Sequence, residues 1–569
     1  MKNGKYDTWS KEELIREITA LRKQKTYGLV WEKDKTKEDF DFFINWDAEK
    51  SKEAFDKEAE NCFPVLKELT DKELTTGNGA ETHILVQGDN YHTLAVLNFT
   101  HRNSVDVIYI DPPYNTGNKD FKYNDQLIDK EDGYRHSKWL SFMSKRLLLA
   151  KNLLKSSGII FISIDDNEYA QLKLLCDEIF GDQNFIANMI WRKVVGGKSQ
   201  GKISTQHEYV LAYAKSEPDL KITFLPLSDR LIKKYRYEDA RGKYDLRELG
   251  QGKGLSYSES LYYEITAPDG SMIPKPPEGS GYRWSKEKWL WGMKQSPPYC
   301  VIKKVKERWV PFVKQYLDYD NEGNKIERGI WPHTILEEVG FTRTGTKQLD
   351  DLIGGGKFEH PKPVELIKHL LALHPDKNAL IVDFFAGSGT TAQAVLELNR
   401  ADGGNRHFIL ATNNENKICT DVCYPRIKKV IDLQEYRDNG KLIKKSIRLK
   451  YYLTDFVSAA PTDKNKRKLV DKCTEMLCIK ENTFDKVKES AHFKIFKNKD
   501  THLGIIFDDE YINDFVKAAQ RIDGKFNVYV FSHDDSVPTN EFKSLKNRVT
   551  LCPIPETILK VYRKVFAND

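Results

Sequence analysis

A carboxylate, two prolines and a tyrosine follow directly on a run of strand-forming residues. Residues 107–118 read VIYIDPPYNTGN. The apolar run before Asp111 predicts a buried strand of a parallel sheet, and Pro112 and Pro113 end it because proline lacks a backbone donor and fixes its own φ. In open α/β sheets, ligands bind at the carboxyl ends of the strands. Asp111 and Tyr114 are therefore predicted to offer a carboxylate and an aromatic face to a ligand at such an edge.

A second segment combines small residues with the predicted end of another strand. Residues 383–393 read DFFAGSGTTAQ, and Gly387 and Gly389 lack the Cβ atoms that a closely approaching ligand would meet. The spacing is not that of a GxGxxG dinucleotide loop, and no Gly-Lys-Ser/Thr closes a phosphate loop. Many such loops are only tight strand-to-helix turns. Asn413, Asn414 and Glu415, at the end of the next predicted strand, favour a ligand loop because they could accept hydrogen bonds from ribose hydroxyls.

Strands and helices alternate around both segments. Strand-then-helix units are predicted at 81–99, 158–181 and 378–398, helices at 136–154 and 358–373, and further strands at 207–215 and 406–415. This alternation predicts an α/β fold with a doubly wound sheet, in which helices cover both faces.

The composition is typical of a soluble globular protein with several domains. Of the 569 residues, 31% are charged and 40% hydrophobic, and the formal net charge is only +6, so any basic surface must be local. No apolar run approaches the roughly 20 residues of a membrane span, and the first residues have no apolar signal-peptide core. The eight cysteines show no CxxC spacing, which favours reduced thiols in a cytoplasm over a disulfide framework or a zinc site.

Changes in the pattern divide the chain into five predicted regions. They are an N-terminal helical region (1–80, with a capping box at Ser10 and Glu13), the first half of the core (81–216), an irregular segment rich in aromatic, basic and proline residues (217–345), the second half of the core (346–432) and a separate α+β C-terminal domain (433–569).

Together these segments resemble the amino-methylating DNA methyltransferases that use S-adenosylmethionine. DPPY at 111–114 is similar to their catalytic tetrapeptide, and FAGSG at 385–389 is similar to their cofactor loop. The catalytic motif precedes the cofactor motif by about 270 residues, which is the circularly permuted order of the β group. The wider similarity, including ILVQGDNYHTL and HPKPVELI, is to the modification (Mod) subunit of Type III restriction-modification systems. The resemblance implies a Rossmann-like methyltransferase core with an inserted target-recognition domain.

The resemblance also implies a reaction, the transfer of a methyl group to the N6 amine of an adenine in double-stranded DNA. The base must first leave the duplex, at a cost of a few kcal/mol. The Asp111 carboxylate and the Pro112 carbonyl would accept the hydrogen bonds of the amine, and Pro113 would hold both acceptors in place. Tyr114 would stack on the base, which returns about 1–3 kcal/mol. This chemistry needs no metal.

The resemblance assigns further residues to the cofactor. They are Asp89, Asn115, Thr116, Lys362, Pro363, Asp383, Phe385, Ala386, Gly387, Ser388, Gly389, Thr390, Asn413 and Glu415. Whether Asn413 or Glu415 holds the ribose stays open, and Lys362 could equally be a solvated lysine at a helix start. The carboxylates of SIDDNE (163–168) are expected to cap a helix.

The irregular segment occupies the place of the family's target-recognition domain. Basic residues interleaved with tryptophans suit contacts to DNA phosphates. The predicted DNA-binding residues are Lys286, Lys288, Lys294, Lys303, Lys304, Arg343 and Lys347. Most of the tryptophans are expected in the core of this domain, and TRTGTK (342–347) is expected to be a flexible basic loop.

The expected partners are double-stranded DNA, a second copy of the chain and a separate restriction subunit that carries ATPase and nuclease, and the expected location is the cytoplasm of a prokaryote, at the nucleoid. The C-terminal domain is expected to make the dimer or partner contacts. Cytosine-N4 methylation is the alternative within the same chemistry, and Asp111 favours adenine because cytosine enzymes more often begin the tetrapeptide with serine. An RNA or protein-glutamine target fits the chain less well. A DNA-recognition subunit that does not methylate is the alternative of a different class.

Overall fold

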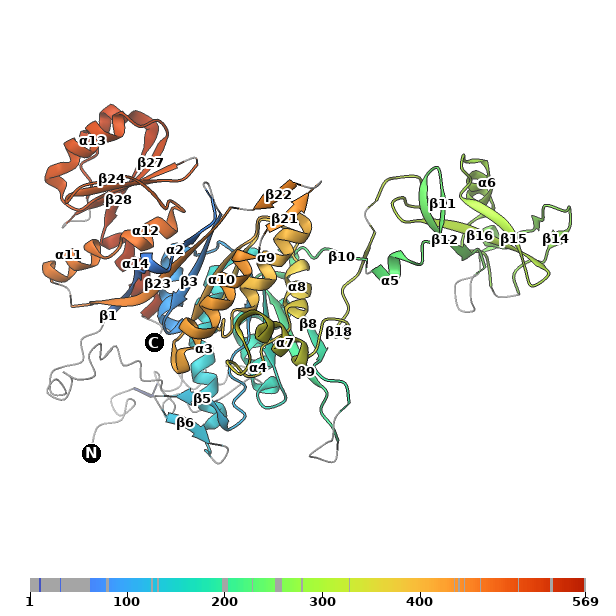
Figure 1. Ribbon diagram of the computed structural model, residues 1–569, viewed down its shortest axis with the longest axis horizontal. Coiled ribbons are helices and arrows are strands. Elements are labelled where there is room, and N and C mark those ends of the chain that lie inside the picture. Colours follow the sequence, from blue (N-terminus) through green and yellow to red (C-terminus); the bar gives the residue numbers. More distant parts are fainter. Residues whose placement is uncertain are drawn as a thin grey trace. The chain divides into compact units, whose positions relative to one another are not determined.

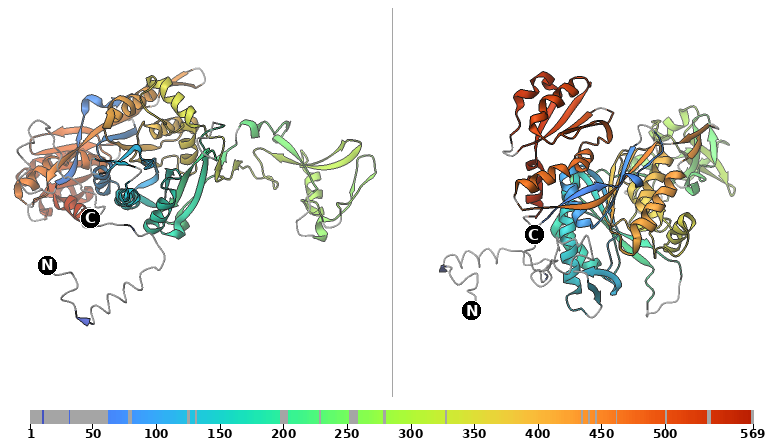
Figure 2. Two further views of the ribbon diagram at one scale, coloured as in Figure 1. Left: turned by 90° about the horizontal axis from the view of Figure 1, so that it is seen from below. Right: turned by 60° about the vertical axis from the view of Figure 1, so that its left-hand side comes forward.

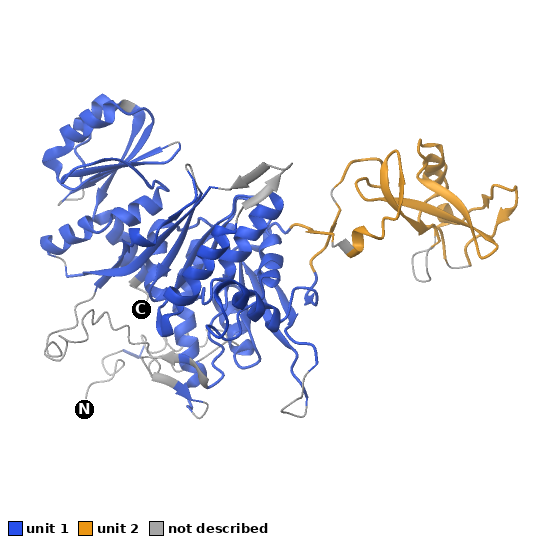
Figure 3. Cartoon of the chain, viewed as in Figure 1, with its two compact units in different colours: residues 1–222, 333–569 blue, residues 223–332 orange. Residues whose placement is uncertain are grey.

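The computed structural model describes Ser10, Lys11, Trp31 and residues 62–566, the latter without 78–80, 124–125, 130–131, 197–202, 228, 251–257, 278–279, 327, 434, 439–440, 445, 461, 500 and 533–535. The helix predicted from Ser10 and Glu13 lies outside the described residues. The chain forms two compact units, called here the main unit (1–222 and 333–569) and the inserted unit (223–332) (Figure 3). None of the described helices is long and apolar enough to cross a membrane.

One large sheet runs through the main unit (Figure 1). In spatial order its strands are β1 (Cys62–Glu68), β23 (Ile447–Ser458), β3 (Glu81–Gln87), β20 (His407–Thr412), β19 (Leu380–Asp383), β4 (Val105–Ile110), β7 (Leu154–Ile164), β9 (His207–Ala214), β8 (Phe185–Arg192) and β18 (Ile335–Leu336), with β2 (Leu74–Thr75) beside β23. The strands from β23 to β7 are parallel, whereas β9 runs antiparallel to β7 and β8. The amino end of β9 therefore lies at the edge where its parallel neighbours end.

Helices cover both faces of this sheet (Figure 2). One set is α2 (Asn90–Thr100), α3 (Arg135–Leu153) and α4 (Tyr169–Phe180), and the other is α7 (Thr342–Ile353), α8 (Val364–Ala372), α9 (Thr390–Asp402) and α10 (Tyr424–Asp432). Ile108 and Ile110 of β4 share a core with the first set, whereas the intervening Val107 and Tyr109 do not. Alternate residues of a strand point to opposite faces, so both faces of β4 are buried. The predicted doubly wound α/β fold is confirmed.

The two sequence motifs meet at one place in this topology. β19 leads through α9 to β20 on one side, and β4 leads through α3 to β7 on the other. β19 and β4 are neighbours, with Val382 opposite Ile108. Chain connections that diverge from two adjacent parallel strands create a topological switch point, where open α/β sheets bind ligands.

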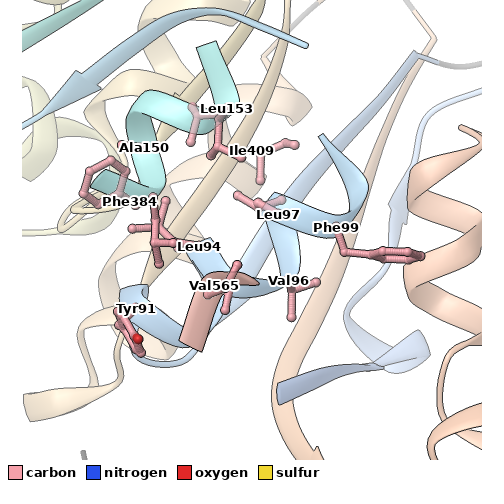
Figure 4. Close-up of a cluster of buried hydrophobic side chains, with 14 of the residues drawn as sticks. Tyr91, Leu94, Val96, Leu97, Phe99, Ala150, Leu153, Phe384, Ile409 and Val565 are labelled. Atoms are coloured by element: carbon pink, nitrogen blue, oxygen red, sulfur yellow. The ribbon is translucent and has the colours of Figure 1, made fainter. Parts of the chain in front are cut away.

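The core around α2 joins the beginning and the end of the chain. Every residue of α2 is buried, which is typical of a helix covered on all sides. Leu94 and Leu97 of α2 lie in one cluster with Leu153 of α3, Ile409 of β20 and Val565 near the C-terminus (Figure 4). The C-terminal segment therefore packs directly on the main fold.

The predicted boundary at 433 is wrong because β23 is part of the central sheet. After a hairpin of β21 (Glu435–Asp438) and β22 (Lys441–Lys444), β23 pairs with both β1 and β3. The helical expectation for 62–80 is wrong for the same reason, since β1 and β2 pair with β23. A strand's partner hundreds of residues away cannot be read from its own sequence.

A second, five-stranded sheet follows β23. Its strands are β24 (Asp485–Glu489), β25 (Phe493–Lys497), β26 (Thr501–Ile506), β27 (Lys525–Phe531) and β28 (Val549–Ile554), and its helices are α11 (Asp463–Asp471), α12 (Thr474–Lys480), α13 (Ile512–Gln520) and α14 (Glu556–Phe566). One face packs on α13, and the other shares the core of α12 and α14, which contact α2.

The inserted unit has its own sheet and core. Its strands and helices are β10 (Leu225–Pro226), α5 (Asp229–Ile232), β11 (Tyr237–Asp239), β12 (Gly242–Glu248), β13 (Ile265–Thr266), β14 (Met272–Ile273), α6 (Lys286–Lys294), β15 (Cys300–Val305), β16 (Arg308–Tyr316) and β17 (Gly329–Ile330). β11, β12, β16 and β15 form an antiparallel sheet around buried aromatic residues. β10 and β17 pair where the chain enters and leaves the unit, with Leu225 opposite Ile330.

The inserted unit is narrower than the predicted segment 217–345. Residues 333–345 belong to the main unit because β18 pairs with β8, and α7 begins at Thr342 and contacts α10. The expected flexible loop at 342–347 is therefore wrong. Gly345 also lets α7 approach the segment before α8 closely, because a Cβ there would lie 2.1 Å from the carbonyl oxygen of Pro361.

Candidate active site

The turn after β4 holds its carboxylate, carbonyls and ring in fixed positions. Trp139 of α3 donates its indole hydrogen bond to the carbonyl of Pro113 at 2.7 Å. No described residue donates to the carbonyl of Pro112. Asn115 is buried and left-handed, with a φ of 56°. Its Nδ2 donates to Glu168 Oε1 at 2.6 Å, so the end of the turn is tied to the segment that follows β7.

Asp111 lies in a network of alternating charges. Lys362 Nζ, two residues before α8, lies 3.0 Å from Asp111 Oδ1 and 3.4 Å from Glu208 Oε2. The Tyr114 hydroxyl donates to the same Asp111 oxygen at 2.8 Å and lies 3.2 Å from Glu208 Oε2. Lys193, directly after β8, pairs with Glu208 Oε1 at 2.9 Å. Within the described chain, Asp111 Oδ2 has no hydrogen-bond partner, and the side chain of Asp111 is 29% exposed.

Burial and neighbouring charges act in opposite directions on these groups. Burial raises the pKa of Asp111 above its usual value, the Lys362 ammonium opposes this, and the Glu208 charge adds to it. For Glu208, burial is outweighed by Lys362 and Lys193, so its pKa is lowered. Burial would lower the pKa of Lys362, yet the two carboxylates raise it. Asp111 is thus a more basic carboxylate than an exposed aspartate.

A second buried carboxylate adjoins this network. Glu168 is fully buried, and burial raises its pKa to about 8. Its Oε1 lies 2.7 Å from His136 Nδ1 and accepts from Asn115. Neither Glu168 Oε2 nor Asn115 Oδ1 has a hydrogen-bond partner among the described residues. The expectation that the carboxylates of SIDDNE cap a helix fails for Glu168, whose side chain caps nothing, whereas Asp165 accepts from the backbone of Asn167 at 2.9 Å.

The glycine loop is fixed by buried polar contacts on both sides. Asp383 ends β19, accepts from the Phe385 backbone at 3.0 Å and from Thr391 at 2.5 Å, and has its pKa raised to about 7 by burial. Arg426 of α10 is fully buried and donates through Nη1 to the hydroxyls of Ser388 at 3.0 Å and Thr390 at 2.8 Å. The loop is therefore held in one conformation by side chains of α9 and α10.

Left-handed glycines allow this conformation. Gly387 and Gly389 have φ values of 49° and 79°. A Cβ on Gly389 would lie 3.1 Å from Cys423 Sγ, whereas one on Gly387 would lie in ordinary contact with Phe358. Side chains other than glycine rarely adopt such φ values, so both positions require glycine for the backbone.

Asp89 and its neighbours connect the end of β3 to the same loop. Asp89 caps α2 through the Tyr91 backbone at 2.7 Å, and its pKa is lowered by Arg146 against the effect of burial. Asn90 donates to the carbonyl of Phe384 at 3.0 Å and accepts from Arg146 at 2.6 Å.

The remaining predicted cofactor residues lie at the same sheet edge or next to it. Thr116 follows Asn115, Pro363 precedes α8, and the loop 385–389 follows β19. Asn413 and Glu415 are exposed beyond the end of β20, which pairs with β19. Asn414 between them is committed to the backbone and hydroxyl of Thr420. The fold thus brings the residues predicted to bind the cofactor to the carboxyl edge of neighbouring strands.

The predicted DNA-binding residues are divided between the two units. In the inserted unit, Lys286, Lys288 and Lys294 are on α6, and Lys303 and Lys304 are on β15. Arg343 and Lys347 belong to α7 of the main unit, where Lys347 pairs with Asp351 at 2.6 Å. Trp284 and Trp289 are buried in the inserted core, as expected, and Trp291 and Trp309 pack on it.

The inserted unit also contains a polar cavity of about 350 Å³. Its lining residues are Arg247, Glu248, Arg283, Trp284, Val313, Gln315 and Asn321. Arg247 is held by Gln315 at 3.1 Å. Sequence reasoning did not find this cavity, because its residues come from separate segments.

The prediction from sequence also missed several residues of the candidate site, above all Glu208, Lys193, Glu168 and Arg426. Glu208 is the one with a visible signal, because a charged residue near the start of the otherwise apolar segment HEYVLAYAK is unusual for a buried strand. Its place depends on the antiparallel direction of β9, which the segment does not reveal.

Residues 105–423 match the model of the DNA methylase family of N6 and N4 methyltransferases. The chain is 37% identical to the Type III restriction-modification enzyme StyLTI Mod subunit of Salmonella typhimurium over 364 residues, which are 58% of this chain and 52% of that one. It is 34% identical to the EcoPI Mod subunit of Escherichia phage P1 over 59% of this chain and 58% of that one. It therefore spans about half the length of these two relatives. It is also 32% identical to the Type II methyltransferase M.KpnI of Klebsiella pneumoniae over 62% of this chain and 86% of that one. The protein belongs to the DNA methylase family.

Proposed function

We propose that this protein transfers a methyl group from S-adenosylmethionine to the N6 amine of an adenine in double-stranded DNA. The observation that carries the proposal is the meeting of two motifs at the switch point of the sheet, where Asp111 ends one strand and the glycine loop follows its neighbour. The carboxylate that accepts from the amine must lie next to the loop that binds the methyl donor, because the amine has to reach the methyl group.

The residues present fit S-adenosylmethionine. Gly387 and Gly389 give the loop after β19 its left-handed backbone, and the half-buried Phe385 begins that loop. The buried acceptor atoms Asn115 Oδ1 and Glu168 Oε2, which have no partner among the described residues, suit the ammonium group of its methionine part. Asn413 and Glu415 would take the ribose hydroxyls. Bound there, the cofactor would supply a methyl group on a positively charged sulfur.

The chain's own residues would prepare the amine. Asp111 Oδ2 and the carbonyl of Pro112 would accept its two hydrogen bonds, so the nitrogen lone pair is less delocalised into the ring. The Tyr114 hydroxyl donates a hydrogen bond to Asp111 and accepts one from Lys362, so the side chain is fixed. Its ring would stack on the base. When the nitrogen gains the methyl group, one N–H bond breaks and Asp111 would accept the proton.

The inserted unit would read the DNA sequence. Its lysines on α6 and β15 would contact phosphates. The two arginines, Gln315 and Asn321 of its cavity carry the donors and acceptors that base edges require. Arg343 and Lys347 would contact DNA from the main unit.

The relatives named as Type III Mod subunits support a narrower assignment. On this proposal, the protein is the modification subunit of a Type III system, acts as a homodimer at the nucleoid, and partners a restriction subunit that carries ATPase and nuclease. The segment beyond β23 would contribute subunit contacts.

Sequencing of modified bases in DNA from cells that express this chain tests the reaction. We expect N6-methyladenine in one short motif, and methylation of one strand only would support the Type III assignment. Asp111→Asn should lower the rate at least about 100-fold, because the amide can still accept a hydrogen bond from the amine but carries no negative charge and cannot take its proton. Asp166→Asn, at an exposed carboxylate beyond β7, is the matched control. N4-methylcytosine, or activity that survives in Asp111→Asn, would contradict the proposal.

A further inference from the structure

Glu208 shares the Lys362 ammonium with the catalytic carboxylate. Both carboxylates lie within 3.4 Å of Lys362 Nζ, and the Tyr114 hydroxyl lies between the same two groups. The side chains of Lys362 and Glu208 are only 10% and 11% exposed, so water screens their interaction weakly. Lys362 is therefore shared between the two carboxylates.

The surrounding elements hold this arrangement in place. Lys362 lies over the rings of Tyr114 at 4.9 Å and Trp191 at 5.8 Å. Lys193 pairs with the other oxygen of Glu208, and its own backbone is fixed by the carbonyl of Gln206 at 2.9 Å. Glu208 therefore has a lysine on each oxygen and stays ionised.

We propose that Glu208 is a positioning residue that holds Lys362 between two carboxylates and so sets the basicity of Asp111. The inference rests on the proposed methyl transfer and adds a residue on β9 to it. Because Lys362 also pairs with Glu208, it neutralises Asp111 only in part. Asp111 therefore stays a strong acceptor, first for the hydrogen bond of the amine and then for the proton that the amine releases.

The direction of the expected effect follows from the groups that face Asp111. They are Lys362 before α8, Glu208 on β9, Tyr114 in its own turn, Tyr109 on β4 and Asp383 at the end of β19. Without the Glu208 charge, Lys362 pairs with Asp111 only, and Asp111 no longer has a like charge beside it. Both changes lower the pKa of Asp111.

The test is the pH profile of single-turnover methylation by Glu208→Gln in the full chain. The acidic limb should move to lower pH by about one unit, because removal of one nearby like charge has an effect of this order. The maximal rate should fall about tenfold with little change in KM for DNA or cofactor, because one pKa unit of basicity corresponds to a factor of ten at most. Glu208→Asp should restore most of the rate, and Glu217→Gln, an exposed glutamate beyond β9, should behave as wild type.

An acidic limb that stays in place or moves to higher pH in Glu208→Gln would overturn the proposal. A second measurement does not depend on activity. Glu208→Gln, Lys362→Met and the double variant are compared by Tm, and the double variant should lose less than the sum of the single losses. Additive losses would overturn the proposal. If the wild-type protein methylates no DNA, the proposed function fails, and the Tm comparison alone decides whether Glu208 positions Lys362.

Discussion

At the scale of single residues, the main feature of the site is that one lysine pairs with two carboxylates. Lys362 neutralises parts of two carboxylates, and Asp111 keeps one oxygen with no partner among the described residues. A lone buried carboxylate would protonate, and one fully paired with a lysine would be a poor acceptor. Sharing one ammonium between two carboxylates leaves Asp111 only partly neutralised, which would suit its proposed role as the acceptor of the amine proton.

Glu168 makes the stability of the protein depend on pH. Burial raises its pKa from 4.5 to about 8, so the folded protein binds this proton more tightly than the unfolded chain does. Its contribution to stability is therefore full below pH 4.5 and is lost as the pH rises towards 8. Glu168→Gln keeps the neutral form at every pH. We expect its Tm to match that of wild type near pH 5 and to exceed it by a few degrees near pH 8.

Thermal unfolding from pH 5 to 9 measures this difference. Glu178→Gln, at an exposed position of α4, is the control and should follow wild type at every pH. Parallel curves for Glu168→Gln and wild type would show that Glu168 is ionised in the folded protein.

At the scale of elements, two separate helices position the glycine loop and the segment that carries Lys362. Arg426 of α10 donates to the hydroxyls of Ser388 and Thr390, and α7 packs closely on the segment that carries Lys362. Gln348 of α7 accepts from the backbone of Val364, the first residue of α8, at 3.0 Å. These contacts fix both sides of the candidate site, as the proposed methyl transfer would require.

Replacement of Arg426 tests this support. Arg426→Met removes a buried donor from Ser388, Thr390 and Gln393, so that Gln393 Oε1 loses its donor, while the two hydroxyls keep their hydrogen bond to each other. We expect a loss of about 3 kcal/mol in the free energy of unfolding and weaker binding of S-adenosylmethionine. Urea unfolding and calorimetry measure the two effects. Lys428→Met, exposed on the same helix, is the control, and a variant that matches it in both measurements would show that the loop does not depend on Arg426.

At the scale of the whole molecule, the two units differ in how the chain builds them. The inserted unit begins and ends at the β10–β17 pair, whereas the main unit is assembled from both ends of the chain, with β23 between β1 and β3. A segment that starts and ends at one point can be removed with little loss of contacts, but a strand inside a sheet cannot.

Two deletions should therefore have opposite results. Replacement of residues 223–332 by a short glycine-serine linker should leave a chain that melts cooperatively and binds S-adenosylmethionine but no longer methylates DNA. A chain that ends at residue 433 should not fold, because it lacks β23 and the helices that cover α2. Thermal unfolding and cofactor calorimetry check both, and a cooperative transition in the chain ending at 433 would show that the C-terminal segment is independent of the sheet.

The sequence by itself determined the local features. The apolar run before Asp111, the prolines after it and the glycines of 385–389 specify a strand end and a tight glycine loop through short-range sterics and periodicity, and the structure has both at those residues. The alternation of strands and helices likewise predicted the doubly wound fold. These properties depend on neighbouring residues, whose types the sequence shows directly.

The tertiary structure alone decided what depends on distant pairs. The place of β23 in the sheet, the start of α7 at Thr342, and the burial of Glu168 and Arg426 follow from partners that no local pattern names. Glu208 reaches Lys362 only because β9 runs antiparallel and turns its amino end towards the edge where the parallel strands end. Paired strands and paired buried charges join residues that are far apart in the chain. Their interaction energies arise only in the completed fold, so no local sequence pattern reveals them.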